Sequence, residues 1–380
     1  MSSTSQVTYP QAIDQHEQPD LQVAEPVADP AQGELFDSGY PAMANQYPQL
    51  RFMGSKYRLL PWIHKILSGL KFGTVVDAFS GSGCVAYLFK AMGKQVVTND
   101  FLNFSATVSR ALIENPGHHL GEERLEQLLA YDPRHKRFIE RTFSGIFYTP
   151  QDLRFLDRVS WNIGKLDDDY ERAIALAALI RSCVKRQPRG VFTIAGDPEH
   201  YKDGRRDLKL TLQEHFLEQV AVYNNAAFDN GQQNEARHGD VFEWDGEPAD
   251  LVYMDPPYVP RSDDNCYMKR YHFLEGLSCY WEGKSIMPES KVKKIDKPYT
   301  PFSYRRTAIE AFDQMFRQFA DSTLILSYSS NGYPDLSELR RLMRRYKRSV
   351  DVFERAHRYH FGNHSTAKRT QVQEYLIIGY

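Results

Sequence analysis

An apolar run that ends in an acid, two prolines and an aromatic residue has the composition to act on an amino group. The run is Leu251-Val252-Tyr253-Met254-Asp255-Pro256-Pro257-Tyr258. It predicts a buried strand, and open α/β sheets bind ligands beyond the carboxyl ends of their strands. Proline has no N–H, so the carbonyl groups of the loop and the Asp255 carboxylate can accept hydrogen bonds from a planar amine. The ring of Tyr258 would stack on the same planar group.

A glycine-rich turn forms the second pattern. The apolar residues 74–76 lead to Asp77, and Ala78-Phe79-Ser80-Gly81-Ser82-Gly83 precedes a helix expected from Cys84. Glycine lets the backbone approach a ligand closely, and the N–H groups of a helix N-terminus bind carboxylate or phosphate. Ala86 stands where a dinucleotide-binding turn has its third glycine. Asp77 is therefore either a cofactor ligand or a loop acid, and Asp100, after the next apolar run, is where a ribose-binding carboxylate belongs.

These motifs require a sheet whose strands alternate with helices. Short apolar runs predict strands at residues 74–77, 95–99, 251–254, 323–327 and 375–378. The spacing within residues 172–185 predicts a strongly apolar helix, inside an insert that extends from about 104 to 236. The sequence therefore predicts an α/β fold in which a mostly helical region interrupts the core sheet.

The first 46 residues differ from the rest of the chain. They are rich in Gln, Pro, Asp, Ala and Ser without an apolar period, which is typical of a disordered tail. Within the tail, Gln32-Gly33-Glu34-Leu35-Phe36 resembles the QxxLF peptide by which bacterial replication proteins dock on the sliding clamp. Such a short pattern is either a docking peptide or a chance match.

The positive charge of the chain is clustered. The net charge is −2, but residues 1–50 carry seven acids and no Lys or Arg, which leaves +5 for residues 51–380. Residues 181–210 hold eight basic and four acidic residues, and residues 334–370 hold ten and four. Such clusters indicate either a phosphate-binding face or solvated helix surfaces.

Composition excludes several classes of protein. The four cysteines, at positions 84, 183, 266 and 279, form no CxxC pair, so neither a zinc site nor a disulfide scaffold is expected. The chain has no apolar run of the roughly 20 residues that a membrane span requires and no signal-peptide pattern. We expect a cytoplasmic protein with neither a metal nor a membrane partner.

Together the motifs resemble the Dam-like, D12-class adenine-specific DNA methyltransferases of the α arrangement. Residues 51–56, Arg-Phe-Met-Gly-Ser-Lys, resemble the N-terminal GxK element of that family. Residues 77–83 resemble its DxFxGxG motif, with Ala78 where proline is common. Residues 239–242, Gly-Asp-Val-Phe, resemble the element that contacts the adenine of the cofactor, and residues 255–258 match the catalytic motif. Residues 326–331 add a weaker match.

The resemblance implies a Rossmann-like S-adenosylmethionine-dependent methyltransferase sheet with a largely helical target-recognition insert. The expected catalytic domain is residues 47–114 and 236–380, and the expected target-recognition region is residues 115–235. Lys56 and the backbone near it would meet the methionine end of S-adenosylmethionine. The implied catalytic residues are Asp255, Pro256, Pro257 and Tyr258. The implied cofactor-binding residues are Phe52, Gly54, Lys56, Asp77, Phe79, Gly81, Gly83, Asp100, Asp240 and Asp255.

Double-stranded DNA is the implied substrate, and its target adenine must leave the duplex to reach Asp255. In the α arrangement the target-recognition region precedes the catalytic motif, which places the DNA contacts in the basic insert. The expected contacts are Lys185, Arg186, Arg189, Arg205, Arg206 and Lys209. The resemblance also admits a cognate restriction endonuclease and, through residues 32–36, a sliding clamp as partners.

Other functions fit the same residues. Methylation of the N4 amino group of cytosine uses a related loop, usually with Ser at the position of Asp255. RNA adenine and a protein glutamine amide are other acceptors, and a DNA-binding regulatory protein without catalysis is an alternative of another class. The aromatic residues 271–281 either close over an extruded base or pack as an apolar helix.

Overall fold

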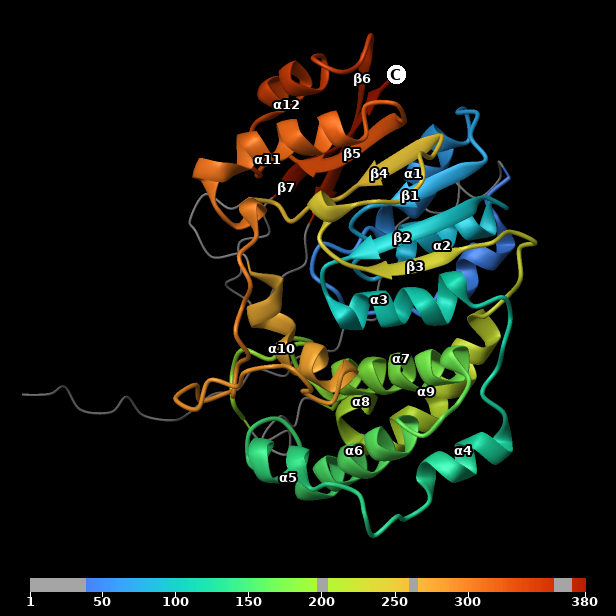
Figure 1. The fold of residues 1–380 in the computed structure, drawn as a ribbon, viewed down its shortest axis with the longest axis vertical. Helices are drawn as coiled ribbons and strands as arrows, with labels where there is room; N and C mark the ends of the chain where they lie inside the picture. Colours follow the sequence, from blue (N-terminus) through green and yellow to red (C-terminus); the bar gives the residue numbers. More distant parts are fainter. Residues whose placement is uncertain (1–38, 197–203, 260–265, 359–370) are drawn as a thin grey trace, which may run out of the picture. The chain divides into compact units, whose positions relative to one another are not determined.

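A seven-stranded sheet forms the centre of the folded unit, residues 39–380 (Figure 1). The computed structural model describes residues 39–196, 204–259, 266–358 and 371–380. The strands are β1 (Thr74–Asp77), β2 (Gln95–Asp100), β3 (Glu235–His238), β4 (Leu251–Met254), β5 (Thr323–Ser329), β6 (Val350–Arg358) and β7 (Gln371–Gly379). Their order across the sheet is β3-β2-β1-β4-β5-β7-β6.

Strands β1 to β5 are parallel to one another, and β6 and β7 add antiparallel pairs at one end of the sheet. β1 pairs with β2 and β4, β2 with β3, and β4 with β5, all in parallel. β7 lies between β5 and β6 and is antiparallel to both. All five predicted strands are confirmed, and the sheet confirms the expected α/β, Rossmann-like methyltransferase fold. The sequence did not predict β3 and β6, which form the two polar edges of the sheet.

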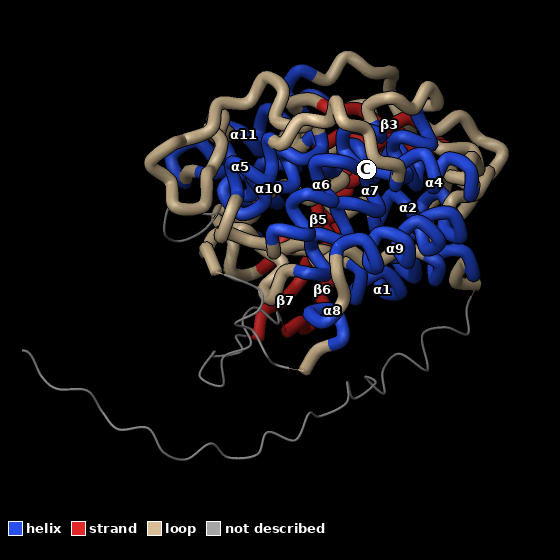
Figure 2. The backbone as a smooth tube through the Cα atoms, turned by 90° about the horizontal axis from the view of Figure 1, so that it is seen from below, coloured by secondary structure: helices blue, strands red, loops and turns tan. Residues whose placement is uncertain are grey.

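Helices cover both faces of the sheet because neighbouring strand residues point to opposite sides. Val75 of β1 belongs to a core that it shares with the early helices, whereas Val76 belongs to a second core with the last two helices. Figure 2 shows the strands running between the helices. The early helices are α1 (Leu60–Leu67), α2 (Cys84–Ala91) and α3 (Asn103–Ser109), and the last are α11 (Arg305–Gln318) and α12 (Leu336–Met343). Short turns of helix are η2 (Ala42–Gln46), η3 (Tyr57–Leu59), η4 (Arg110–Glu114), η6 (Val241–Glu243) and η7 (Pro301–Ser303).

A helical layer packs on α3, away from the sheet (Figure 1). Its helices are α4 (Glu122–Leu129), α5 (Phe138–Phe143), α6 (Pro150–Ile163), α7 (Asp169–Arg186), α8 (Arg206–Lys209), α9 (Leu212–Ala226) and α10 (Tyr267–Ser278). The predicted apolar helix at residues 172–185 lies within α7, which contacts α3 and α9. Asp168 caps α7 by accepting the N–H groups of Tyr170 and Glu171.

The last of these helices, α10, follows the catalytic motif in sequence but packs with the insert. Tyr271, Phe273 and Trp281 are 1%, 0% and 5% exposed. The rings of Phe273 and Trp281 lie 5.3 Å apart, edge to face. The structure therefore supports the packing interpretation of residues 271–281, and the helical layer is larger than the predicted insert of residues 115–235.

The folded unit begins at Gly39, so the predicted tail of residues 1–46 extends too far. Ala44 and Tyr47 are 2% and 4% exposed, and the Tyr47 hydroxyl donates to the carbonyl oxygen of Ser82 in the glycine-rich turn. The ring of Tyr40 packs on His64 of α1. These aromatic residues bury enough apolar surface to order residues 39–46. The clamp-like peptide at residues 32–36 lies outside the described residues.

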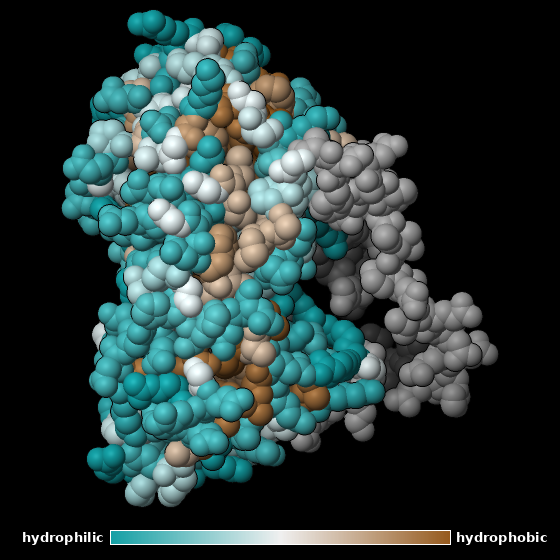
Figure 3. Space-filling model, turned by 90° about the vertical axis from the view of Figure 1, so that its right-hand side faces the viewer, coloured by the Kyte–Doolittle hydropathy of each residue, from teal (hydrophilic) through white to brown (hydrophobic). Residues whose placement is uncertain are grey.

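The described surface is mainly polar. Figure 3 shows a mostly hydrophilic face on which apolar residues form small separate groups. No described helix combines the length and the apolar composition needed to cross a membrane. The large apolar side chains are gathered instead in the two cores on either side of the sheet.

Candidate active site

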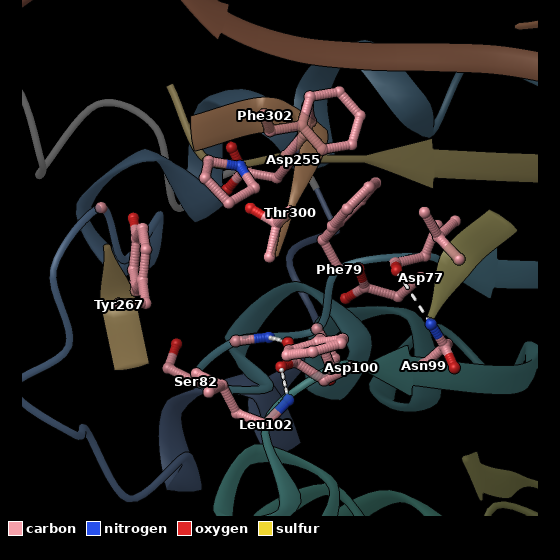
Figure 4. Close-up of a pocket in the computed structure, with 18 of the residues that line it drawn as sticks. Asp77, Phe79, Ser82, Asn99, Asp100, Leu102, Asp255, Tyr267, Thr300 and Phe302 are labelled. Carbon is pink, nitrogen blue, oxygen red and sulfur yellow. Dashed lines mark hydrogen bonds between the residues drawn. The ribbon is translucent and has the colours of Figure 1, made fainter. Parts of the chain in front are cut away.

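A cavity opens at the carboxyl edge of the sheet, beyond the ends of β1, β2 and β4 (Figure 4). Its atom-free space, part of it continuous with solvent, is about 1220 Å³. Parallel neighbours in a sheet end at the same edge, so motifs from distant parts of the chain meet there. The predicted residues that line the cavity are Phe52, Gly54, Lys56, Asp77, Phe79, Gly81, Asp100, Asp240, Asp255, Pro256, Pro257 and Tyr258.

One predicted cofactor residue, Gly83, does not line the cavity. It precedes α2 with φ of 80°, a left-handed conformation that favours glycine, so its contribution is the shape of the turn. The sequence missed several lining residues, among them Asn99, Tyr267 and residues 298 and 300–303. Asn99 and Tyr267 adjoin elements that the sequence did predict, whereas residues 298–303 reach the site from a long connection after α10.

A buried ion pair between Lys56 and Asp255 lies at the centre of the site. The Lys56 ammonium lies 2.8 Å from the Asp255 carboxylate and donates to the Gly54 carbonyl oxygen at 3.2 Å. Burial raises the pKa of Asp255 to about 6, although Lys56 acts to lower it. Burial acts to lower the pKa of Lys56, but Asp255 and Glu374 more than offset this and raise it. At neutral pH the pair is therefore a carboxylate on Asp255 and an ammonium on Lys56.

Glu374 is a site residue that no local pattern of the sequence marks. It lies on β7, is 0% exposed, and accepts a hydrogen bond from the Tyr258 hydroxyl at 3.0 Å. The Tyr258 ring also meets the Lys56 ammonium, 4.9 Å from its centroid, and the edge of Tyr328, at 4.8 Å. Contacts on several sides therefore fix the orientation of the Tyr258 side chain before any ligand binds.

Asp77 and Asp100 bring two further carboxylates to the cavity. Burial, followed by the charges of Asp255 and Asp100, raises the pKa of Asp77 well above its ordinary value. Oδ1 of Asp77 has no hydrogen-bond partner among the described residues. Asp100 accepts the N–H groups of Gly81 at 2.7 Å and Leu102 at 2.8 Å, as Figure 4 shows. Burial nevertheless raises the pKa of Asp100 to about 6.

Aromatic rings form another part of the cavity wall, near Asp240. Asp240 accepts the N–H of Phe242 at 3.0 Å and so fixes η6. Phe302 stacks on Phe242 with 5.7 Å between centroids and meets Phe79 edge to face at 5.6 Å. This part of the wall therefore offers flat apolar surfaces beside a carboxylate, which suits a purine ring.

The basic residues predicted to contact DNA lie apart from these elements, and one of them points inward. Arg186 is 7% exposed and donates to the Leu208 carbonyl oxygen and, at 3.4 Å, to Asp152. Its prediction as a DNA contact is wrong, because a buried guanidinium needs internal partners. Most of the others also have internal partners, whereas Arg189 and Lys209 are exposed. The internal contacts are Lys185 with Asp207, Arg206 with Glu218 and Arg205 with the Pro188 carbonyl oxygen.

The order of the strands, and the Asp-Pro-Pro-Tyr loop after β4 beside a glycine-rich turn after β1, have the arrangement expected of a methyltransferase that acts on amino groups. The family model of the D12 class N6 adenine-specific DNA methyltransferases matches residues 52–328. The chain belongs to this family, which confirms the resemblance and favours adenine over cytosine.

Curated relatives agree with this assignment. The type II methyltransferase M2.HphI of Haemophilus parahaemolyticus is 30% identical over 342 residues, which cover 86% of this chain and 97% of that protein. The type II methyltransferase M.NlaIII of Neisseria lactamica is 23% identical over 316 residues, with coverages of 78% and 88%. The chain thus matches these relatives over nearly their whole length.

Replacing Lys56 should shift the pH dependence of the reaction. If Asp255 must be ionised to accept an amino hydrogen, the rate falls as pH drops through its pKa of about 6. Lys56→Met removes the charge that lowers this pKa, so the acid limb of kcat/KM should move to higher pH. Lys56→Arg keeps the charge and should move it much less. An acid limb that stays in place in Lys56→Met would contradict this role of the pair.

Glu374 should act through the Tyr258 hydroxyl. Glu374→Leu removes the acceptor of this hydrogen bond, which contributes about 0.5–1.5 kcal/mol net, so kcat should fall by roughly two- to tenfold. Tyr258→Phe removes the other partner of the same bond. If the bond is what matters, the double variant should lose no more activity than either single variant. Additive losses in this cycle would show that the two residues act independently.

Proposed function

We propose that the protein transfers a methyl group from S-adenosylmethionine to the N6 amino group of adenine within a specific DNA sequence. The observation that carries the proposal is the position of Asp255. Its carboxylate lies at the wall of the cavity, after β4, in contact with Lys56 and beside the glycine-rich turn. An acceptor for amino hydrogens and the cavity therefore share one edge of the sheet.

The residues of the cavity fit S-adenosylmethionine. The cofactor carries positive charge, and the charges of Asp255 and Asp100 add to burial in raising the cost of ionising Asp77, which a cation in the cavity would reduce. The unpartnered Oδ1 of Asp77 is suited to a cofactor donor. We assign the ribose to Asp100 and the adenine ring to Asp240 and Phe302. When bound, the cofactor supplies an electrophilic methyl group with its own leaving group.

The protein's task in the reaction is to align and polarise the amine. Asp255 and the Pro256 carbonyl oxygen accept the two hydrogens of the amino group, which favours lone-pair density on nitrogen. Lys56 keeps Asp255 ionised, and Tyr258, held by Glu374, stacks on the adenine. Extruding a base from the duplex costs a few kcal/mol. Stacking contributes roughly 1–3 kcal/mol per base and offsets part of that cost.

The names of the relatives support a proposal for the biological setting. Two of them are named type II methyltransferases and a third, from Lactococcus lactis subsp. lactis, is named modification methylase LlaI. We therefore place the protein in the cytoplasm, with double-stranded DNA as substrate and a restriction endonuclease of the same specificity as partner. Residues 115–235 would read the sequence, and the exposed cations Arg189 and Lys209 remain candidates for contacts there.

Substitution of the catalytic acid tests the proposal. Asp255→Ala, and the isosteric Asp255→Asn, should abolish tritiated methyl transfer to DNA, while calorimetry still detects binding of S-adenosylmethionine. Asp245→Ala changes an acid whose side chain is 91% exposed and should leave the activity intact. Methylome sequencing of a methylation-free host that expresses the protein should show N6-methyladenine. Unchanged turnover of the Asp255 variants, or N4-methylcytosine in the methylome, would refute the assignment.

Binding of the N-terminal peptide to the sliding clamp can be tested separately. A peptide spanning Gln32 to Phe36 should bind the bacterial sliding clamp, and the paired change Leu35→Ala with Phe36→Ala should remove that binding because both apolar anchors are truncated. Fluorescence anisotropy of the labelled peptide measures both. Equal, negligible affinity of the native and changed peptides would identify the match as chance.

A further inference from the structure

We propose that the connection between α10 and α11 grips the DNA strand on both sides of the extruded nucleotide. We call residues 282–306 of this connection, including the first turn of α11, the strap. The inference rests on the proposed function and adds a DNA-contacting element outside the predicted target-recognition region. It is carried by four exposed cations that flank the cavity-lining part of the strap in sequence.

The first half of the strap is a small, anchored hairpin. Ile286 and Ile295 form an antiparallel bridge, and the N–H of Met287 donates to the Lys294 carbonyl oxygen at 2.8 Å. Val292 and Ile295 are each 4% exposed and belong to the main core. In Figure 1 the connection runs from α10 to α11 along one side of the molecule and carries a protruding loop. The hairpin is therefore held in place by buried side chains.

The second half of the strap forms part of the cavity wall. Pro298 and residues 300–303 line the cavity, and Phe302 is 4% exposed between Phe79 and the second core. Figure 4 shows Thr300 and Phe302 on the same side of the cavity as Asp255. Any polymer that presents a base to Asp255 must therefore pass close to the strap.

The strap carries a surplus of positive charge. Residues 282–306 include seven Lys and Arg residues against three acids. Four exposed cations flank the lining residues 298 and 300–303 of the strap in sequence. They are Lys291 and Lys297 before these residues and Arg305 and Arg306 after them. None of the four takes part in an ion pair among the described residues, and three of them lie over tyrosine rings instead. By contrast, Lys185 and Arg206 of the predicted basic stretch are neutralised by Asp207 and Glu218.

Stability of the fold does not explain these cations. Arg305 and Arg306 occupy the first turn of α11, where the helix dipole disfavours positive charge and where no acidic residue compensates. The Arg305 guanidinium lies 4.3 Å from the centre of the Tyr333 ring, which holds it at the surface. An anionic partner at this place would offset the unfavourable charge.

Two aromatic rings accompany the cations. Tyr299 is 58% exposed, and its ring stacks on that of Tyr304 with 5.7 Å between centroids and 12° between planes. An exposed aromatic ring beside cations, here Tyr299 stacked on the half-buried Tyr304, is the combination by which proteins bind unpaired nucleotides. DNA with one base extruded presents that chemistry, because its phosphates continue on both sides of an unstacked position. The cations would hold the phosphates, and the rings would contact the bases left next to the gap.

The salt dependence of DNA binding tests the proposal. Lys291→Ala with Lys297→Ala, and separately Arg305→Ala with Arg306→Ala, should each reduce the slope of log K against log salt by about 0.9 for each phosphate that the variant no longer neutralises. The matched control is Lys65→Ala with Lys71→Ala, two exposed lysines that precede β1 in sequence and do not line the cavity. The control should keep the wild-type slope. Charge-preserving changes of the strap cations, Lys to Arg and Arg to Lys, should give a slope close to that of the wild type.

Three results would bear on the proposal in different ways. Reduced slopes in both strap pairs, with unchanged thermal unfolding, support it. Wild-type slopes in both pairs of an enzyme that still methylates DNA would overturn the proposal and leave the proposed function standing. A wild-type protein that neither binds nor methylates DNA would overturn both.

The rings are tested separately from the cations. With 2-aminopurine at the target position identified from the methylome, Tyr299→Ala should diminish the fluorescence increase that accompanies base extrusion, without a change in the salt slope. Tyr131→Ala removes a tyrosine that is 71% exposed in the helical layer and should have no effect. An equal fluorescence increase in the wild type, Tyr299→Ala and Tyr131→Ala would show that Tyr299 does not contact the DNA next to the extruded base.

Discussion

The arrangement of the site depends on the burial of one ion pair. An ammonium as buried as that of Lys56 is tolerable only with a partner, and Asp255 provides it across 199 positions of the sequence. The pair ties the loop before α1 to the end of β4. It also fixes the protonation of the catalytic acid, since burial favours the neutral carboxyl group while the nearby ammonium favours the charged one. Neither residue could be replaced by an apolar one without changing both the packing and the chemistry.

The parallel sheet explains why several carboxylates lie in the same cavity. Three carboxylates, on Asp77, Asp100 and Asp255, reach one cavity because β1, β2 and β4 are parallel neighbours that end together. Such crowding is costly in a protein without a cationic ligand. Backbone N–H groups at Asp100 and the ammonium at Asp255 reduce this cost, while Asp77 retains an unpartnered oxygen. The electrostatics of the protein's own residues thus already favour a cation of the size of the cavity.

The sequence predicted the strands and motifs that have a local residue pattern. It did not predict the residues whose role depends on contacts between distant parts of the chain. The strands with buried residues on both faces, such as β4, appear as continuous apolar runs, and the glycine turn and catalytic loop have distinctive residue types. β3 and β6 produced no such signal, because edge strands expose polar side chains. Glu374 resembles any acid of a strand until β7 is placed beside β5. Arg186 appeared to be a surface cation because its burial depends on Leu208 and Asp152, which are distant in sequence.

The position of β7 has a consequence for how the enzyme is made. Glu374 follows Tyr258 by 116 residues, so the ribosome must extend the nascent chain well past the catalytic loop before the last support of that loop exists. At synthesis rates of about 5–20 residues per second this takes on the order of ten seconds. Between the synthesis of β5 and that of β7, the edge of β5 that β7 later covers is unpaired, and β7 is also the strand that separates β5 from β6. Fragments that stop before β7 therefore lack both the completed sheet and the hydrogen bond that orients the Tyr258 hydroxyl.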